Sequence, residues 1–303
     1  MALEPERKGF LCKARAMTQV WMTPGSNDAG LDDAGLNGAQ MTNTNASPGP
    51  REVRPGVLVY PDLPAVARAA AQEFVKLAGR FIATHGMFHA ALSGGNTPAQ
   101  LFRLLASDEF RLSIDWASTH LYWSDERCVP PDHPDSNFGM AQRELLQHIS
   151  IPAGNIHRMK ADVADLDRAA KDYEETLRQN LPLTSGGFPC FDLIFLGMGS
   201  DGHTASLFPG ALFPGSEDPR QTSDWVVSPY VEKFQAHRMT LTLPVLNAAR
   251  EVIFLVTGAD KAESLRTVVE GTRNPPLPAQ LVTVTNGHRL FLIDESAASL
   301  LIS

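Results

Sequence analysis

Short apolar runs alternate with segments of helical periodicity along most of this chain, and that alternation limits the folds open to it. Strands are predicted over Gly56–Tyr60, Met87–Leu92, Ser118–Trp123, Phe191–Leu196, Trp225–Val227, Met239–Leu243, Glu251–Val256, Leu281–Thr285 and Leu290–Ile293, and helices over Leu63–Thr84, Ala99–Ala106, Ser136–His148, Asp165–Asn180 and Gly258–Glu270, with a terminal helix from Asp294. Such alternation is typical of an α/β fold with a largely parallel sheet and helices on both faces.

The chain is long enough for one large domain, with 303 residues of which 43% are hydrophobic. We predict a single α/β domain over residues 51–303. Residues 1–50 differ, because Gly25–Pro50 is rich in Gly, Asn, Asp, Ser and Thr and has almost no large apolar side chain. This extension is predicted to be disordered, and its internal methionines leave open that part of it precedes the true start.

Charge and cysteine content exclude several function classes. The net charge of −8 argues against nucleic acid or an anionic membrane as the main partner, since both favour broad basic surfaces. No apolar run reaches the length of about 18 residues that a transmembrane helix needs. The three cysteines, Cys12, Cys128 and Cys190, are too few and too far apart for a disulfide framework or a metal site. We expect a cytoplasmic protein without metal or cofactor.

The loop after the apolar run Phe191–Leu196 carries the strongest catalytic signal. Closely spaced glycines, Gly197 and Gly199, let backbone N–H groups approach a ligand, and Asp201 and His203 follow. Histidine can take up and return a proton near neutral pH, so His203 is a candidate general base. The alternative is an ordinary glycine turn with a structural histidine.

Gly197, Gly199 and Gly202 also match the G-x-G-x-x-G pattern of dinucleotide-binding folds. That pattern requires a long helix beginning at its third glycine, whereas Pro209 and Pro214 would interrupt such a helix. Nicotinamide binding is therefore disfavoured.

A second glycine loop follows the predicted strand Met87–Leu92, with the sequence Ser93-Gly94-Gly95-Asn96-Thr97-Pro98. Thr97 suits an N-cap and Pro98 the first helical position. A helix N-terminus behind paired glycines favours an anion such as phosphate, because free N–H groups and the helix dipole point toward it. An ordinary strand-to-helix turn remains the alternative.

Charged residues outside the two glycine loops follow other predicted strands. Asp125 and Glu126 could act as paired carboxylates, although adjacent charges at a strand end more often are solvated or hold an arginine. Arg127 could bind an oxyanion, and Lys261 near a helix start suggests an anion that compensates its charge. Cys128 has no partnered base in the sequence, which disfavours a nucleophilic role.

Several motifs together resemble the 6-phosphogluconolactonase family, within a wider group that includes glucosamine-6-phosphate deaminase. They are Leu92–Pro98, Trp123–Pro130 with Asp135-Ser136-Asn137, Phe191–Pro209, Arg238–Pro244 with Asn247, and Thr257–Leu265. The resemblance covers about Val57 to Asp294 and implies a modified Rossmann-like fold. Leu290 stands where many relatives have Trp, and residues 1–50 have no counterpart in the family core.

The resemblance also implies an activity and the residues that perform it. It implies a cofactor-free esterase of the pentose phosphate pathway that hydrolyses 6-phospho-D-glucono-1,5-lactone. Separately, we expect a monomer or small homo-oligomer. His203 would be the catalytic base with Asp201 beside it, and the other implied site residues are Ser93, Gly94, Gly95, Asn96, Thr97, Asp125, Arg127, Gly199, Arg238 and Lys261. An amino-sugar-phosphate deaminase or isomerase and a non-catalytic sugar-phosphate sensor are the alternatives.

Overall fold

The computed structural model describes residues 49–210, 220–271 and 273–302, so the predicted disordered segment 1–50 lies outside it except for its last two residues. From Pro50 onward the described residues form one compact unit. Within these ranges, no helix combines the length and the apolarity needed to cross a membrane.

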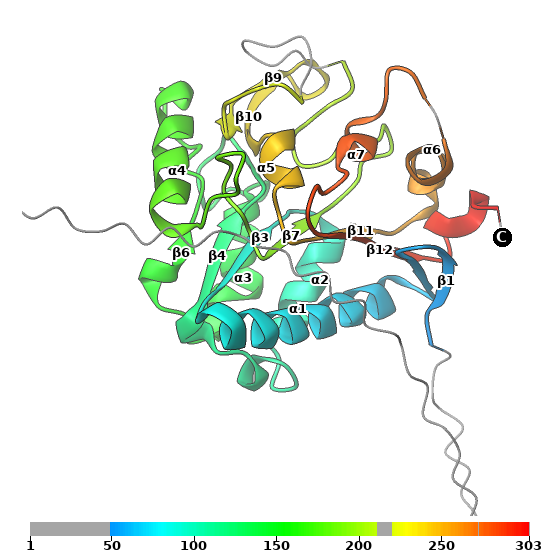
Figure 1. Ribbon diagram of the computed structural model, residues 1–303, viewed down its shortest axis with the longest axis horizontal. Helices are drawn as coiled ribbons and strands as arrows, with labels where there is room; N and C mark the ends of the chain where they lie inside the picture. Colours follow the sequence, from blue (N-terminus) through cyan, green and yellow to red (C-terminus); the bar gives the residue numbers. More distant parts are fainter. Residues whose placement is uncertain (1–48, 211–219, 272, 303) are drawn as a thin grey trace, which may run out of the picture. The chain divides into compact units, whose positions relative to one another are not determined.

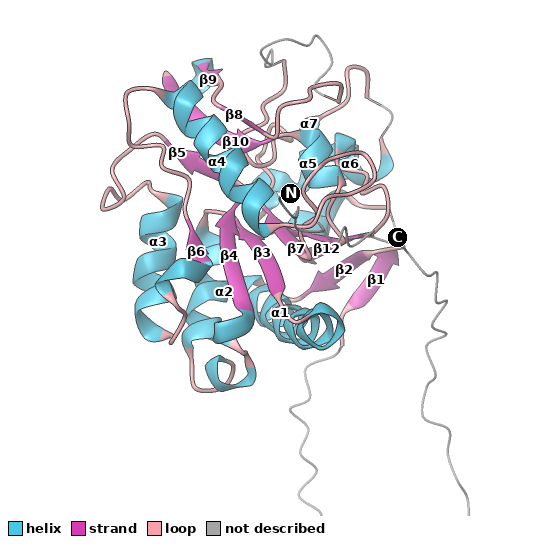
Figure 2. Cartoon of the chain, turned by 60° about the vertical axis from the view of Figure 1, so that its left-hand side comes forward, coloured by secondary structure: helices cyan, strands magenta, loops and turns pink. Residues whose placement is uncertain are grey.

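An eight-stranded sheet forms the centre of the fold and confirms the predicted α/β class. Its strands, in spatial order, are β1 (Arg51–Arg54), β2 (Val57–Tyr60), β12 (His288–Asp294), β11 (Glu251–Val256), β7 (Leu193–Leu196), β3 (Phe88–Leu92), β4 (Thr119–Trp123) and β6 (Ile156–His157). Figure 2 shows most of them in this order. All neighbours are parallel except β1 and β2, and β3 and β7 are buried throughout, as expected for central strands covered on both faces.

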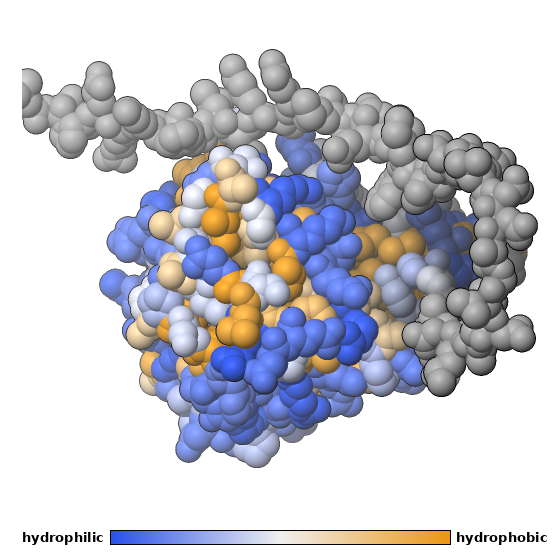
Figure 3. All heavy atoms as spheres, turned by 90° about the horizontal axis from the view of Figure 1, so that it is seen from below, coloured by the Kyte–Doolittle hydropathy of each residue, from blue (hydrophilic) through white to orange (hydrophobic). Residues whose placement is uncertain are grey.

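Helices cover both faces of the sheet. They are α1 (Leu63–His85), α2 (Asn96–Ala106), α3 (Asn137–Glu144), α4 (Leu166–Asn180), α5 (Leu243–Asn247), α6 (Ala262–Glu270) and α7 (Pro278–Leu281). Figure 1 shows α1 and α2 on one face and α5 and α7 on the other. The outer surface on the α1 side is mostly hydrophilic, with some hydrophobic residues near its middle (Figure 3). The buried residues of α1, such as Val66, Ala70 and Phe74, recur at the helical spacing seen in the sequence.

Local sequence sets the limits of α1. The side chain of Asp62 accepts a hydrogen bond from the backbone N–H of Ala65 at 2.9 Å, which caps the start of the helix. Gly86 ends it in the left-handed conformation, with φ of 87°, a conformation that costs glycine little. The chain then enters β3 directly.

The connections between strands reverse direction at the middle of the sheet. From β3 the chain continues to β4 and β6 on one side, and from β7 it continues to β11 and β12 on the other. Loops that follow two such neighbouring strands diverge and leave a crevice at their carboxyl ends, where open α/β sheets bind ligands. The two glycine loops found in the sequence, Ser93–Thr97 and Gly197–His203, are the loops that flank this crevice.

A small antiparallel sheet, which the sequence did not indicate as separate, extends the fold beyond β4. It contains β5 (Asp125–Arg127), β10 (Ala236–Leu241) and β8 (Val226–Val227), and β9 (Tyr230–Val231) also pairs with β10. Only Ser124 separates β4 from β5. The register places Arg238 opposite Arg127 and Thr240 opposite Asp125, so residues more than a hundred positions apart become neighbours.

Two predicted elements near the carboxyl end are wrong. Leu281–Thr285 does not form a strand, because the side-chain oxygen of Asn247 accepts hydrogen bonds from the backbone N–H groups of Thr283 and Val284, at 2.7 and 3.2 Å. The terminal helix does not begin at Asp294 either. This residue ends β12, and only a 3₁₀ turn, Ala297–Leu300, follows.

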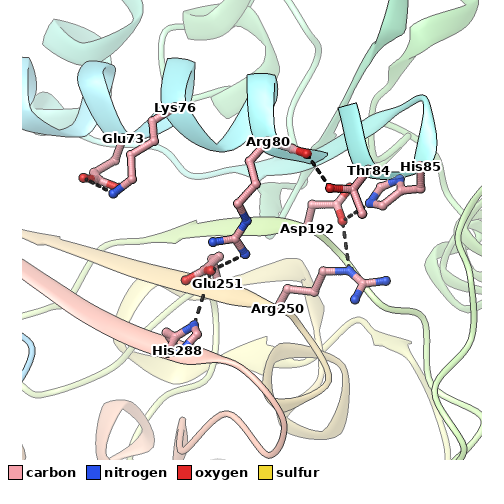
Figure 4. Close-up of polar contacts among 9 residues, drawn as sticks. All are labelled: Glu73, Lys76, Arg80, Thr84, His85, Asp192, Arg250, Glu251 and His288. Carbon is pink, nitrogen blue, oxygen red and sulfur yellow. Dashed lines mark hydrogen bonds and ion pairs between the residues drawn. The ribbon is translucent and has the colours of Figure 1, made fainter. Parts of the chain in front are cut away.

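Ion pairs join α1 to the amino ends of the central strands, at the edge opposite the crevice (Figure 4). The carboxylate of Asp192, 1% exposed, accepts from Arg250 Nε at 3.0 Å and contacts His85 Nε2 at 3.1 Å. Nearby, Arg80 binds Glu251 at 2.8 Å. A buried carboxylate needs such partners, because an unpaired charge away from water is costly.

Candidate active site

A cavity of about 560 Å³ lies in the crevice at the carboxyl ends of β3 and β7, within the size range of small-molecule sites. It brings together most of the residues that the sequence predicted. Those lining it are Ser93, Gly94, Gly95, Asn96, Thr97, Asp125, Arg127, Gly199, His203 and Lys261. Asp201 and Arg238, also predicted, are not among the lining residues. The two glycine loops therefore open into one hollow.

His203 and Asp201 form a hydrogen-bonded pair beside the cavity. The Nδ1–H of His203 donates to Oδ1 of Asp201 at 2.5 Å, and the backbone N–H of His203 donates to the same oxygen at 3.2 Å. This contact assigns the ring proton to Nδ1 and leaves Nε2 as the unprotonated nitrogen of the neutral ring. Among the described residues, none makes a hydrogen bond to Nε2 of His203.

The surroundings of this pair favour a neutral imidazole. Burial lowers the pKa of His203, and the lowering exceeds the opposite effect of the Asp201 carboxylate. Burial alone would raise the pKa of Asp201, but hydrogen bonds from Lys233 and His203 bring it well below its usual range. At neutral pH, Asp201 is thus ionised and His203 is free to accept a proton.

The imidazole of His203 packs against Phe208 and Gly199. Its ring stacks on Phe208, with centroids 4.2 Å apart. Gly199 also lies close to the ring: a Cβ added to it would lie 2.0 Å from Nδ1, so only glycine leaves room for the ring at this position. The loop also uses two of its own N–H groups: Gly199 donates to the carbonyl of His203 and Gly202 to that of Gly199, both at 2.9 Å.

The Ser93–Thr97 loop directs the N-terminus of α2 into the cavity. Gly95 occupies the cap position with φ of 113°, and no side chain caps the helix. Thr97, predicted as the N-cap, lies inside the helix, and its hydroxyl contacts that of Thr257 at 2.8 Å. The N-cap prediction is wrong because α2 already begins at Asn96, so that Thr97 and Pro98 are its second and third residues. The hydroxyl of Thr97 instead joins α2 to the loop after β11. The hydroxyl of Ser93 donates to the carbonyl of Phe195 at 3.0 Å and so joins β3 to β7.

Gly94 is needed for close packing rather than for its backbone angles. A Cβ at this position would lie 1.8 Å from Oδ1 of Asn137. The amide of Asn137 in turn donates to the backbone and side-chain oxygens of Asp125, at 2.9 and 3.3 Å. Ser206 donates to the other oxygen of Asp125 at 2.7 Å, which fixes this carboxylate at the cavity wall.

Glu126 has a structural role. Its carboxylate is buried and accepts hydrogen bonds from the backbone N–H groups of Asn137 and Phe138, both at 2.8 Å, at the start of α3. Burial raises the pKa of Glu126 despite these bonds. We expected this carboxylate to be solvated or to bind an arginine side chain. That expectation is wrong, because Glu126 instead binds the N–H groups at the N-terminus of α3.

Two guanidinium groups lie on adjacent strands near the cavity. Arg127 lines it and donates from Nη1 to the carbonyl of Asp135 at 2.7 Å, while its Nε is buried without a partner in the described chain. Arg238 is its neighbour across the β5–β10 pair. Burial and the positive charge of Arg127 lower the pKa of Arg238. Neighbouring cations of this kind are suited to an anionic ligand.

Lys261 also lines the cavity. It ends a 3₁₀ turn, Ala259–Lys261, that precedes α6, and its Nζ lies 2.7 Å from Oδ2 of Asp260. The preceding Gly258 has φ of 100° and donates its N–H to both oxygens of Asp294, at 3.0 and 3.1 Å. This contact ties the loop after β11 to the end of β12.

Sequence reasoning missed several residues at the site. Thr257, Asp260 and Asp294 line the cavity, and each lies just after or at the end of a parallel strand, a position that could have indicated them. Lys233, whose Nζ lies 2.9 Å from Oδ2 of Asp201, had no such signal. It is 32 residues away along the chain.

Three alternative chemistries lack support in the described residues. No helix begins at Gly202, since the described residues after it form turns and bridges, so the context of a dinucleotide fingerprint is missing. Burial raises the pKa of the Cys128 thiol to about 11, which keeps it from being a nucleophile at neutral pH. In the part of the chain that the structure describes, no group of three or more His, Cys, Asp or Glu side chains is placed to hold a metal ion.

Known proteins resemble this chain in sequence and in structure. The family model for glucosamine-6-phosphate isomerases/6-phosphogluconolactonase matches residues 61–291. The 6-phosphogluconolactonase of Synechocystis sp. is 40% identical over 217 residues, covering 71% of this chain and 85% of the relative. That of Haemophilus influenzae is 38% identical, covering 70% of this chain and 87% of the relative.

A solved structure supports the same relationship. The 6-phosphogluconolactonase of Trypanosoma brucei superimposes with a TM-score of 0.72 and 28% sequence identity, covering 82% of this chain and 99% of that one. Similarity of sequence over most of residues 61–291 thus accompanies similarity of fold. The chain belongs to the glucosamine-6-phosphate isomerase/6-phosphogluconolactonase family.

Proposed function

We propose that this protein hydrolyses 6-phospho-D-glucono-1,5-lactone to 6-phospho-D-gluconate. One observation carries the proposal: His203, paired with Asp201, lines the same cavity as the uncapped N-terminus of α2. The cavity thus combines a base with a site for an anion. The names of the relatives, 6-phosphogluconolactonase, support this choice of substrate.

The phosphate would dock against the Ser93–Thr97 loop. The N-terminus of α2 offers N–H groups and a positive dipole end, and Gly94 and Gly95 allow the ligand to approach the backbone. Arg127 and Lys261 add positive charge from the cavity lining, and Arg238, paired with Arg127 across β5 and β10, adds a further positive charge nearby. Binding of the phosphate would hold the ring with its C1 carbonyl near His203.

Hydrolysis would then proceed by general-base catalysis. Nε2 of neutral His203 removes a proton from water as the water oxygen attacks C1, and a tetrahedral oxyanion forms. The bond between C1 and the ring oxygen breaks as the imidazolium of His203 returns the proton to that oxygen. Asp201 stabilises the imidazolium through Nδ1–H. The N–H groups of Gly199 and Gly202 bond within the loop, so other donors would stabilise the oxyanion.

Turnover of the lactone by the wild-type protein and by His203→Gln tests the proposal. The variant should lose about 10² to 10⁴ in kcat with little change in KM, and spontaneous hydrolysis must be subtracted. Because burial lowers the pKa of His203, the acidic limb of kcat/KM should lie below the usual histidine pKa of 6.5. Full activity of His203→Gln would disprove the assignment of the base.

Two other results would favour the alternative functions. Ammonia release from glucosamine 6-phosphate would favour a deaminase, and binding of the sugar phosphate without turnover would favour a sensor.

We further propose a cytoplasmic location and a monomer or small homo-oligomer. The low cysteine count supports a reducing compartment. Cell fractionation and light scattering coupled to gel filtration test these two proposals.

A further inference from the structure

A lysine from the small antiparallel sheet reaches the His203–Asp201 pair. Lys233 lies in a 3₁₀ turn, Glu232–Phe234, between β9 and β10, and its Nζ is 2.9 Å from Oδ2 of Asp201. Oδ1 of the same carboxylate accepts both N–H groups of His203. Each oxygen of Asp201 therefore has its own partner, and the carboxylate is held at both ends.

The same turn adds aromatic support to the imidazole. Phe234 packs edge-on against Phe208, with centroids 5.8 Å apart, and Phe208 stacks on His203. Gln235 ends the turn in the left-handed conformation, with φ of 47°, so that the chain can enter β10. One short turn thus places the ammonium group of Lys233 against Asp201 and the ring of Phe234 against Phe208.

We propose that Lys233 is a positioning residue for the proposed base: by binding Oδ2, it fixes the orientation in which Asp201 holds the imidazole of His203 with Nε2 free. This inference rests on the proposed role of His203. Lys233 does not line the cavity, so it acts through Asp201 rather than on the substrate.

The charges that face His203 give this role a measurable signature. Asp201 and Asp125 are negative and raise its pKa, whereas Lys233 is positive and lowers it. Loss of the lysine charge should therefore raise the pKa of His203 and move the acidic limb of the rate profile to higher pH. Loss of the hydrogen bond should also lower kcat, because the imidazole is then oriented less firmly.

The test compares Lys233→Met with Lys233→Arg and with Lys76→Met as a matched control. Lys76 also pairs with a carboxylate, Glu73 at 3.0 Å, and it is 60% exposed, against 51% for Lys233. For Lys233→Met we expect the apparent pKa of the acidic limb of kcat/KM to increase by roughly 0.2–0.7 pH unit. We also expect kcat to fall about tenfold with KM unchanged. Lys233→Arg should restore both values, and Lys76→Met should change neither.

Titration of His203 by NMR, assigned with His203→Gln, gives the same shift without relying on turnover. Suppose that kcat falls in Lys233→Met while the acidic limb of kcat/KM and the NMR pKa of His203 stay at their wild-type values. This result would overturn the inference, because it would indicate a structural role only. So would a Lys233→Met enzyme with wild-type kcat and pH profile. Failure of the proposed function looks different: the wild-type protein would not hydrolyse the lactone, or His203→Gln would remain active.

Discussion

The Cα of Gly199 lies against the imidazole of His203, so close that a Cβ there would fall 2.0 Å from Nδ1 and 2.1 Å from Cε1. Gly199→Ala should therefore displace the ring and lower kcat by about 10²-fold, the usual cost of a misplacement near 1 Å. Steady-state kinetics measure this. Gly79→Ala on α1 is the control, because a Cβ at this exposed glycine meets nothing within 4 Å and Gly79 does not line the cavity. Equal kcat values for the two variants would contradict the role assigned to this packing.

Lys261→Ala should weaken binding of the phosphorylated lactone. Lys261 is 25% exposed at the cavity wall, and loss of a hydrogen bond to a charged group costs about 10- to 100-fold in affinity. We expect KM to rise by that factor with kcat little changed, and Lys171→Ala, an exposed lysine on α4, to behave as wild type. Assays with the lactone lacking its phosphate complete the experiment. Similar turnover of the two lactones by the wild-type protein would refute phosphate docking.

Asp192→Ala should destabilise the fold without affecting catalysis. The variant removes the hydrogen bonds that Arg250 Nε and the buried backbone N–H of His89 donate to this carboxylate, which is 1% exposed, and the loss of a hydrogen bond to a charged group costs about 1.5–3 kcal/mol. Urea unfolding measures the free energy, and kcat/KM at 25 °C should stay unchanged. Asp172→Ala serves as the control. Its carboxylate is 59% exposed and binds Arg168, so its loss should cost less than about 1 kcal/mol.

His89 should make the protein less stable in acid. Burial is the main reason why the pKa of His89 is lowered from 6.5 to about 4. Between these values the unfolded chain binds a proton that the folded chain does not, so stability is full above pH 6.5 and falls as the pH drops toward 4. The shift corresponds to about 3 kcal/mol.

Urea unfolding at pH 7 and pH 4.5 measures this loss of stability. His89→Gln should lose less stability than the wild type over that range. His133→Gln, at a side chain that is 44% exposed, should keep the wild-type dependence. Parallel pH dependence of the wild type and His89→Gln would show that another group controls acid stability.

The sequence allowed the central sheet and the two glycine loops to be predicted, because buried parallel strands leave continuous apolar runs and their loops meet at one edge. It did not predict the β5–β10 pair. Asp125–Arg127 is only three residues long and has the composition of a loop, so long-range pairing with Arg238–Thr240 decides its structure. The same pairing is why Lys233 was missed: its contact with Asp201 depends on where the small sheet places the turn before β10.

The reversal of strand order between β3 and β7 divides the site between two halves of the chain. The serine that follows β3 and the phenylalanine of β7 that it contacts, Ser93 and Phe195, are 102 residues apart. A nascent chain that has emerged only as far as β6 thus carries the anion-binding loop without any base, and the later half alone carries the base without that loop. Appearance of activity during refolding would accordingly mark the moment when these two distant strands join, rather than the folding of either half.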